Sequence, residues 1–510
     1  MRYALLFILL AGFARAADPA NPAALPALTA EDLASPAAAG ALGASLATGS
    51  DGRAWLSWLE RGPGAETALR FSVFDATAKS WAPTRTVARG ADWFVNWADF
   101  PALAPGPDGH ATAVWFVNNP STPGAAVAHD HDGPGYHAMI SQSADAGKTW
   151  SAPLPLTRES TSVEFVSLAT LADGRVLAAW LDGRAKHGGG KTQQLYARVL
   201  GSTDADTLVD PSVCDCCSTT LTAFLDGSAL LAYRGRTNEE VRDIRVARFR
   251  RGGWDEPRAL NHDDWRIAGC PVNGPQIASD GGRVAAAWFT ASDNDPRVLI
   301  SFSPDAGARF LMPLRLDTAK PAGRVDTLLL RDGAMLASWV SADGAIEMRR
   351  VSPDFALGES LQLSRPEPGR MKSVTRMALV RDYAGGTISA QLLVAFAQDG
   401  ATAGVRTLLV SVPEGEMLAA EKNCDCSPTA EQLQGFAIRG TLLEARPAEG
   451  VVHVTHPELP GIFPAGTHVF NVSPNRLTPA QAGRSFLGRI ERRDGAWWLF
   501  DVRLIATPQK

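Results

Sequence analysis

One motif recurs along this chain at a nearly constant spacing. It consists of an Asp-Gly-type turn, a short apolar stretch and a closing aromatic residue, as in "SDGRAWLSW", "ADGRVLAAW" and "RDGAMLASW". A period of roughly 50 to 65 residues that holds several strands per unit limits the chain to a repetitive architecture. The closing residues are Trp58, Trp115, Trp180, Tyr233, Trp288, Trp339 and, in a looser copy, Phe396.

The units share an internal order that predicts β-structure throughout. An apolar stretch such as "FVSLATL" comes first, and the turn, the stretch with the aromatic residue and a third stretch such as "RVLISFS" follow. Asp-Gly between two such stretches is typical of a β-hairpin, and helical periodicity is scarce. We therefore predict an all-β fold that contains a β-propeller of seven blades, with six blades as the alternative.

Length and charge limit the classes of partner. A chain of 510 residues exceeds what one hydrophobic core usually organises, unless the core is built by repetition. The net charge is only -5, which gives no electrostatic reason to expect nucleic acid or an anionic membrane as partner. We expect a small-molecule, glycan or metal-ion ligand, and the sequence identifies no protein partner.

Residues 1–16 have the pattern of a secretory signal peptide. A positive start is followed by the apolar run "YALLFILLAGF" and by the small-residue cleavage site "ARA". The run is shorter than the about 20 residues that span a bilayer, and the sequence has no other long apolar run. We therefore predict a periplasmic or secreted protein, in which disulfides can form.

Two segments carry a further pattern, Ser-x-Asp-x-Gly-x-x-aromatic. They are "SADAGKTW" at Ser143–Trp150 and "SPDAGARF" at Ser303–Phe310. The Asp side chain can bind backbone N–H groups of a tight turn while Gly takes the left-handed conformation. This pattern resembles the Asp-box, or BNR, repeats of the sialidase-like β-propeller family, across roughly residues 40 to 415. The resemblance implies a sialidase-like propeller, in which Asp-boxes lie at the outer edges of blades and do no chemistry.

Half of the six cysteines stand together in "VCDCC". In a propeller, the residues that precede the innermost strands meet at one mouth of the central channel. We expect Cys214, Cys216 and Cys217 to meet Cys270, which precedes the first strand of the next unit. A disulfide between Cys270 and one of the other three is one interpretation, and a soft-metal site for copper, or alternatively zinc, is the other. Three cysteines exceed the need of one bond, so both can hold.

Charged residues occupy the same positions in other units. Active members of the sialidase family bind the substrate carboxylate with three arginines and use a Tyr-Glu nucleophile pair with an acidic Asp. The resemblance therefore implies a glycoside hydrolase of the exo-sialidase type that acts on acidic glycans, although the Arg-Ile-Pro signature of that family is absent. The candidate catalytic residues are Asp99, Glu164, Arg234, Arg242, Arg324 and Asp326.

The composition changes after "LLVSVPEG". A segment with Cys424 and Cys426 reads as a linker, and about five strands in roughly 75 residues then predict a small OB-like β-barrel. The order of its motifs resembles the small β-barrel of periplasmic copper-efflux and copper-chaperone proteins. His456 and Pro464 match that pattern, whereas Phe463, Gly466 and His468 replace its methionine ligands. The resemblance implies a copper site at His456, with His468 and His453 as substitute ligands, and Cys424 and Cys426 just upstream are further candidate metal ligands.

These observations divide the chain into five parts and leave three functions open. The parts are a signal peptide (1–16), an N-terminal segment (17–40), a propeller (41–418), a Cys-containing linker (419–432) and a barrel (433–510). The first function is ligand or metal binding, with copper as the leading ion, at the mouth of the channel. The alternatives are a sialidase-type hydrolase and a disulfide-stapled interaction scaffold.

Overall fold

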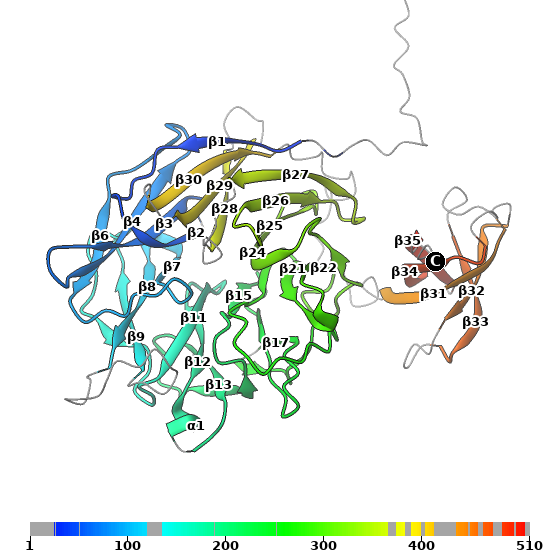
Figure 1. Ribbon diagram of the computed structural model, residues 1–510, viewed down its shortest axis with the longest axis horizontal. Helices are drawn as coiled ribbons and strands as arrows, with labels where there is room; N and C mark the ends of the chain where they lie inside the picture. The colour runs from blue at the N-terminus through cyan, green and yellow to red at the C-terminus, as the bar shows by residue number, and fades with distance from the viewer. Residues whose placement is uncertain are drawn as a thin grey trace, which may run out of the picture.

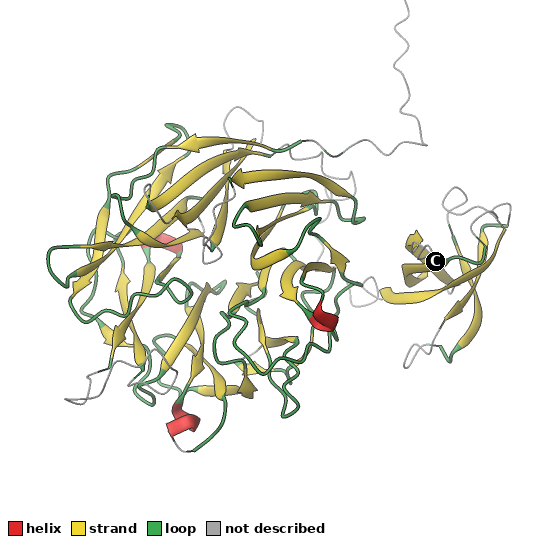
Figure 2. Ribbon diagram, in the orientation of Figure 1, coloured by secondary structure: helices red, strands yellow, loops and turns green. Residues whose placement is uncertain are grey.

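A computed structural model gives the fold of most of the chain. It describes residues 25, 27–49, 51–119, 135–187, 189–250, 252–365, 374–382, 389–398, 403–412, 435–446, 449–456, 463–472, 482–493 and 496–504. Strands dominate these residues, and helices are short and few (Figure 2). The predicted signal peptide, Cys424 and Cys426 lie outside the described residues. Among the described residues, no helix has the length and apolar character needed to cross a membrane.

Seven antiparallel sheets form the blades of a propeller in the described part of the chain, which confirms the predicted fold. Blades one and two contain β2 (Leu42–Thr48), β3 (Ala54–Arg61), β4 (Thr67–Asp75), β5 (Ser80–Trp81) and β6 (Arg85–Gly90), then β7 (Ala102–Pro105), β8 (Ala111–Asn118), β9 (Tyr136–Ser143) and β10 (Leu154–Pro155). Blades three and four contain β11 (Val163–Thr170), β12 (Val176–Asp182), β13 (Gln193–Val199) and β14 (Thr207–Val213), then β15 (Thr220–Ala223), β16 (Ala229–Arg234), β17 (Ile244–Arg250), β18 (Gly253–Trp254) and β19 (Arg258–Ala259).

The remaining blades follow the same order. Blade five contains β20 (Gln276–Asp280), β21 (Arg283–Thr290), β22 (Arg297–Ser303) and β23 (Leu314–Arg315). Blade six contains β24 (Pro321–Leu329), β25 (Met335–Ser341), β26 (Ile346–Val351) and β27 (Leu357–Ser364). Blade seven contains β28 (Thr375–Asp382), β29 (Ser389–Gln398), β30 (Gly404–Ser411) and β1 (Thr29–Leu33). The helical turns are α1 (Arg184–His187), Pro107–Gly109 and Ser292–Asn294.

The first strands of the blades form a ring around the central axis. Each contacts the first strand of the next blade, from β2 through β7, β11, β15, β20, β24 and β28 back to β2 (Figure 1). The outermost strand of blade seven is β1, which pairs with β30 so that Thr29 lies opposite Ser411. Residues 17–40 were predicted to lie outside the propeller, so this pairing is a correction. The pairing covers the outer edge of blade seven, where unpaired backbone groups would otherwise be exposed.

The aromatic residues of the repeat lie inside the blades. Each stands on the second strand of its sheet and is almost completely buried, and the seven are Trp58, Trp115, Trp180, Tyr233, Trp288, Trp339 and Phe396. Their burial explains the repeat, because each blade buries one such ring against its neighbours. The hydrophobic core is therefore divided into clusters between successive sheets, such as the one that joins Trp339 of blade six to Ala285 of blade five.

The two Ser-x-Asp-x-Gly segments form hydrogen-bonded turns. In the first, Ser143 Oγ accepts a hydrogen bond from Gly147 N at 2.9 Å, and Asp145 Oδ1 accepts one from Thr149 N at 2.8 Å. The bonds from Thr149 hold the pKa of the exposed Asp145 carboxyl at about 2. Gly147 has a φ of 74°, which explains the glycine at this position. The segment at Ser303–Phe310 makes the same bonds through Ser303 and Asp305.

The C-terminal part is a separate closed barrel. It is built from β31 (Gly435–Arg446), β32 (Val451–His456), β33 (Gly466–Asn471), β35 (Ala496–Leu504) and β34 (Ser485–Arg493), in that order around the barrel. The pairs are antiparallel except for β33 and β35. This confirms the predicted small barrel of about five strands.

Candidate functional site

The starts of several blades converge on the central channel, as the repeat predicts. Where these blade starts meet, the channel holds a narrow cavity of about 30 Å³. That volume suits ordered water and is too small for a sugar ring. Its lining comes from six segments that precede or begin the first strands of blades two to seven, and includes Trp97, Phe165, Ser218, Asn273, Arg324 and Arg376.

The cysteine cluster lies beside this cavity. Cys216, in the loop before β15, forms a disulfide with Cys270, in the loop before β20. This confirms the predicted staple between blades four and five. Cys216 is 4% exposed, whereas Cys270 lies in an exposed stretch of its loop. The bond therefore joins a buried sulfur to one near solvent.

Cys214 and Cys217 are free thiols, and both are buried. Their sulfur atoms lie 3.4 Å apart, and Cys214 Sγ lies 4.0 Å from Cys216 Sγ. The three sulfurs all lie within 4.8 Å of one another. Val272 packs against the cluster, and Asn273 N donates a hydrogen bond to Cys217 Sγ at 3.4 Å. The predicted meeting of four cysteines therefore occurs, with two of them left as thiols.

A glycine allows the two cysteine-bearing loops to approach each other. A Cβ atom on Gly274 would lie 2.1 Å from the backbone oxygen of Ser218, far inside van der Waals contact. Only glycine, which has no Cβ atom, allows the backbone of Ser218 to come this close. The sequence "CPVNGP" thus sets the distance between the loop of Cys270 and the loop of Cys217.

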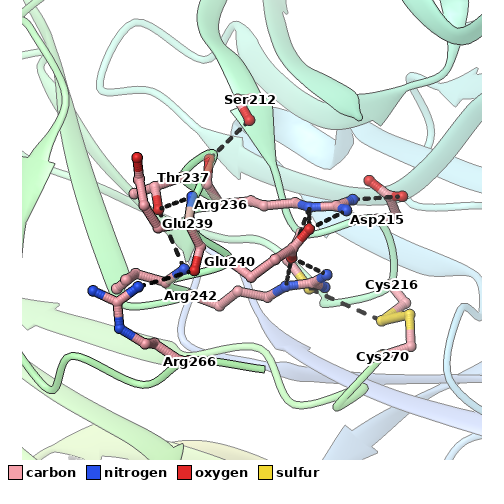
Figure 3. A network of polar contacts seen from close by, with 12 residues as sticks. Ser212, Asp215, Cys216, Arg236, Thr237, Glu239, Glu240, Arg242, Arg266 and Cys270 are labelled. Carbon is pink, nitrogen blue, oxygen red and sulfur yellow. Dashed lines mark hydrogen bonds and ion pairs between the residues drawn. A yellow bond between two sulfur atoms is a disulfide. The ribbon is translucent and has the colours of Figure 1, made fainter. Parts of the chain in front are cut away.

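Arg242 is hydrogen-bonded to one of the free thiols. It is buried, its Nη1 donates to Cys214 Sγ at 3.3 Å, and its Nη2 donates to Glu240 Oε2 at 2.8 Å. Glu240 also binds Arg236, which in turn reaches Asp215, and Figure 3 shows this network beside the disulfide. The carboxylate of Glu240 thereby fixes both guanidinium groups at the edge of the cluster.

The two thiols differ in acidity. The contact with Cys217 and the positive charges of Arg234 and Arg242 lower the pKa of Cys214 to about 6, against the opposing effect of burial. Burial and the neighbouring Cys214 raise the pKa of Cys217 well above its ordinary value. These shifts favour the thiolate at Cys214 over that at Cys217, and the thiolate is the reactive, metal-binding form of cysteine.

Arg234 uses its guanidinium inside the fold. It is 1% exposed, and its nitrogens donate to the carbonyl oxygens of Arg242, Asn273 and Phe289 at 2.6 to 3.0 Å. These bonds satisfy the carbonyls of two loops and of strand β21. The side chain is thus part of the scaffold that holds the cluster, and it does not face the channel.

Asn273 and Asp326 join neighbouring blades by the same kind of bond. Asn273 Oδ1 accepts a hydrogen bond from Arg324 N at 2.8 Å, and Asp326 Oδ2 accepts one from Met377 N at 2.7 Å. Burial raises the pKa of Asp326 to about 6, although the nearby Arg376 opposes this shift. Each acceptor therefore binds the backbone of the next blade, a structural task that the repeat alone did not indicate for Asp326.

Arg324 lines the cavity and is held from two sides. It has a φ of 57°, which is strained for a residue with a side chain. Its guanidinium donates to the carbonyl of Val272 and lies 4.9 Å above the ring of Trp97. Burial lowers the pKa of Arg324 to about 10, so the group stays charged at neutral pH.

Asp99, Tyr136 and Glu164 form a second titratable group. Asp99 Oδ2 accepts hydrogen bonds from the Tyr136 hydroxyl at 2.7 Å and from Phe165 N at 2.8 Å. Burial, Asp99 and the nearby Glu164 together raise the pKa of the Tyr136 hydroxyl. Burial raises the pKa of Asp99 to about 8 and that of Glu164 to about 7. Tyr136 was absent from the predicted set because it stands on β9, away from the start of any blade.

The predicted metal ligands of the barrel lie together. His468 Nδ1 and His456 Nε2 are 2.9 Å apart, and His456 is 3% exposed. The ring of Phe463 packs against both histidines and that of Phe470 against His456, and Trp497 packs against Phe463. Copper binding here remains a prediction, as does any role for Cys424 and Cys426.

Comparisons with known proteins bear on the fold alone. No protein-family model and no curated protein matches the chain. Among solved structures, the BP39L lectin from Burkholderia pseudomallei shares 11% identity over 74% of this chain and 97% of the lectin, with a TM-score of 0.52. The match to the Hadza microbial sialidase Hz136 spans 62% of this chain and 66% of the sialidase chain, at 15% identity and with a TM-score of 0.41. The Ruminococcus gnavus intramolecular trans-sialidase covers 72% and 93% at 9% identity, with a TM-score of 0.40. The likeness to the lectin supports the β-propeller.

Proposed function

We propose that this protein is an exported β-propeller whose cysteine cluster binds a soft metal ion, with Cu(I) as the preferred ion. The observation that carries the proposal is the 3.4 Å separation of two buried free sulfurs, Cys214 and Cys217. Two thiolates bound tetrahedrally to one zinc, at the usual Zn–S length, would lie about 3.8 Å apart. The two sulfurs therefore lie near enough to share one metal ion.

The choice of copper over zinc follows from the ligand number and the charge. A structural zinc site uses about four ligands, and the intact disulfide leaves the cluster with the two thiols of Cys214 and Cys217. Soft thiolates select Cu(I). A Cu(I) bis-thiolate carries a net negative charge, which the guanidinium of Arg242, 3.3 Å from Cys214, would offset.

The proposal is tested with the full-length chain under anaerobic conditions. Metal-free protein is titrated with Cu(I) against a chromophoric Cu(I) chelator. We expect one tightly bound ion that is lost in Cys214→Ser and in Cys217→Ser and is kept in Cys424→Ser/Cys426→Ser and in His456→Ala/His468→Ala. Loss of the ion only in the histidine variant would move the site to the barrel and refute the proposal for the propeller.

A second candidate function, hydrolysis of an acidic glycan, is supported by one observation. The Tyr136 hydroxyl donates a hydrogen bond to Asp99, and the nearby Glu164 adds to burial and Asp99 in raising the pKa of that hydroxyl. These are the residue types that the sialidase resemblance implies for the nucleophile pair and the acid. Turnover of a fluorogenic sialoside that disappears in Glu164→Gln would support this function. The small cavity and the internal bonds of Arg234 count against it.

A further inference from the structure

The free thiols and the disulfide are in contact inside one cluster. Cys214 Sγ lies 4.0 Å from Cys216 Sγ, which is one half of the disulfide, and 3.4 Å from Cys217 Sγ. The other half of the disulfide, Cys270, lies in an exposed stretch. A thiolate exchanges with a disulfide by attacking one of its sulfurs. The attacking atom and its target are thus already neighbours.

We propose that these four cysteines carry out an internal thiol–disulfide exchange that moves the disulfide from the Cys216–Cys270 pair to the Cys214–Cys217 pair. The exchange goes beyond the proposed metal site, because it requires no metal. It uses the same sulfur atoms, so a bound ion would block it.

The exchange proceeds in two steps that balance. The Cys214 thiolate attacks Cys216 Sγ, the Cys214–Cys216 bond forms, the Cys216–Cys270 bond breaks, and Cys270 leaves as a thiolate. Cys217 then attacks Cys214 Sγ, the Cys214–Cys217 bond forms, and Cys216 leaves and takes up the proton that Cys217 releases. Two electrons pass from the Cys214–Cys217 pair to the other pair, and no outside oxidant or reductant takes part.

Neighbouring groups hold the sulfurs in place for this sequence. Arg242 Nη1 donates to Cys214 Sγ, and Asn273 N donates to Cys217 Sγ. Asn273 lies three positions after Cys270, so the same loop anchors one reacting sulfur and carries the leaving group. The three sulfurs within 4.8 Å provide both contacts that the two steps require.

The product of the exchange has a chemical use. It places a reduced sulfur, Cys270, at an exposed position, with Cys216 beside it. Such a pair can reduce an exposed disulfide of a partner protein: Cys270 attacks the partner disulfide, and Cys216 then displaces the partner thiol and restores the Cys216–Cys270 bond. The two electrons come from Cys214 and Cys217, which remain as a disulfide. The substrate class that we infer is therefore an accessible protein disulfide.

The exchange can be tested by mapping bonds on the full-length chain in a Cys424→Ser/Cys426→Ser background. The protein is freed of metal with a chelator, incubated with N-ethylmaleimide without reductant, quenched in acid and digested with trypsin. Cys214, Cys216 and Cys217 fall in one tryptic peptide, residues 199–234, and Cys270 falls in another, residues 267–283. We expect the cross-link between these peptides to disappear with time, as peptide 267–283 gains maleimide and peptide 199–234 keeps an internal disulfide.

Three variants separate the steps. Cys214→Ser should slow the release of Cys270 at least about tenfold, because it lacks the attacking sulfur. Cys217→Ser should still release Cys270 but stop at the Cys214–Cys216 bond. This second variant keeps the exchange testable even if Cys214→Ser fails to fold. Ser212→Ala, at the end of β14 and two positions before Cys214, removes only a hydroxyl that donates to the carbonyl of Arg236, so it should behave as the parent chain.

Two outcomes would overturn the inference. One is a cross-link that survives while Cys214 and Cys217 are both alkylated. The other is release of Cys270 in Cys214→Ser at the rate of the parent chain. Neither outcome depends on the copper titration, so failure of the exchange and failure of the metal site are distinguishable.

Discussion

The Nη1 atom of Arg242 lies 3.3 Å from the sulfur of Cys214, and both side chains are buried. A buried cation in contact with a cysteine favours its thiolate form. Glu240 holds the guanidinium from the other side, 2.8 Å from Nη2. The chemistry of the cluster, whether metal binding or exchange, therefore depends on a charge that comes from the loop after β16.

The first prediction concerns the acidity of Cys214. Its pKa is lowered to about 6 first by the contact with Cys217 and then by the charges of Arg234 and Arg242. Arg242→Met should raise this pKa, and Cys217→Ala should raise it further. Ultraviolet absorbance of the thiolate as a function of pH measures the change. Arg236→Met, which removes a cation that binds Glu240 but no sulfur, should leave the titration where it is.

The second prediction concerns the disulfide. It joins residues separated by 54 positions, and closure of a loop of that length lowers the entropy of the unfolded chain by an amount worth about 4 kcal/mol. Cys216→Ser/Cys270→Ser should lose approximately this much free energy of unfolding, measured by denaturant titration of the propeller. Reduction of the parent chain should give the same loss. A change below about 1 kcal/mol would show that the loops are held by their other contacts.

The third prediction concerns the contribution of Asp326 to stability. Its Oδ2 atom accepts the hydrogen bond of Met377 N from the next blade. Asp326→Ala should cost about 1–3 kcal/mol of stability, because a buried N–H loses its acceptor. Asp326→Asn keeps an acceptor oxygen and should cost much less. If both variants were as stable as the parent chain, the bond between blades six and seven would carry no stability.

The fourth prediction concerns pH. Burial raises the pKa of Asp99 to about 8, of Glu164 to about 7 and of Asp326 to about 6. A carboxyl with a raised pKa in the folded state adds stability below its unfolded pKa of about 4 and loses it as pH rises through the folded value. The contribution of these three groups should therefore fall between about pH 4 and pH 8.

This pH dependence can be measured as the midpoint of thermal unfolding. Asp99→Asn, which cannot ionise, should reduce the fall in stability between about pH 4 and pH 8. The Cys214 thiolate acts in the opposite direction, because its lowered pKa adds stability as pH rises from about 6. The measurement is therefore made on Cys214→Ser as well. In the Cys214→Ser chain, an unfolding midpoint that rises steadily from about pH 4 to pH 8 would contradict the prediction.

Much of the fold followed from the sequence because propellers repeat a local pattern. The Asp-Gly turns and the aromatic residues from Trp58 to Phe396 are fixed by each unit's own hairpins and core, and a unit needs only its neighbours to bury its faces. The same logic placed Cys216 and Cys270 in adjacent loops at the mouth of the channel. Seven sheets and a C-terminal barrel of about five strands were therefore predictable from short-range order.

What the sequence could not determine are the contacts made between blades. Only the tertiary structure decides that Cys216, rather than its neighbour Cys217, reaches Cys270. It also assigns Arg234 to three backbone carbonyls and Arg242 to a sulfur, although both are arginines in one short segment. The physical reason is that these bonds join loops distant in sequence, and a difference of a few ångströms in their approach decides which donor meets which acceptor.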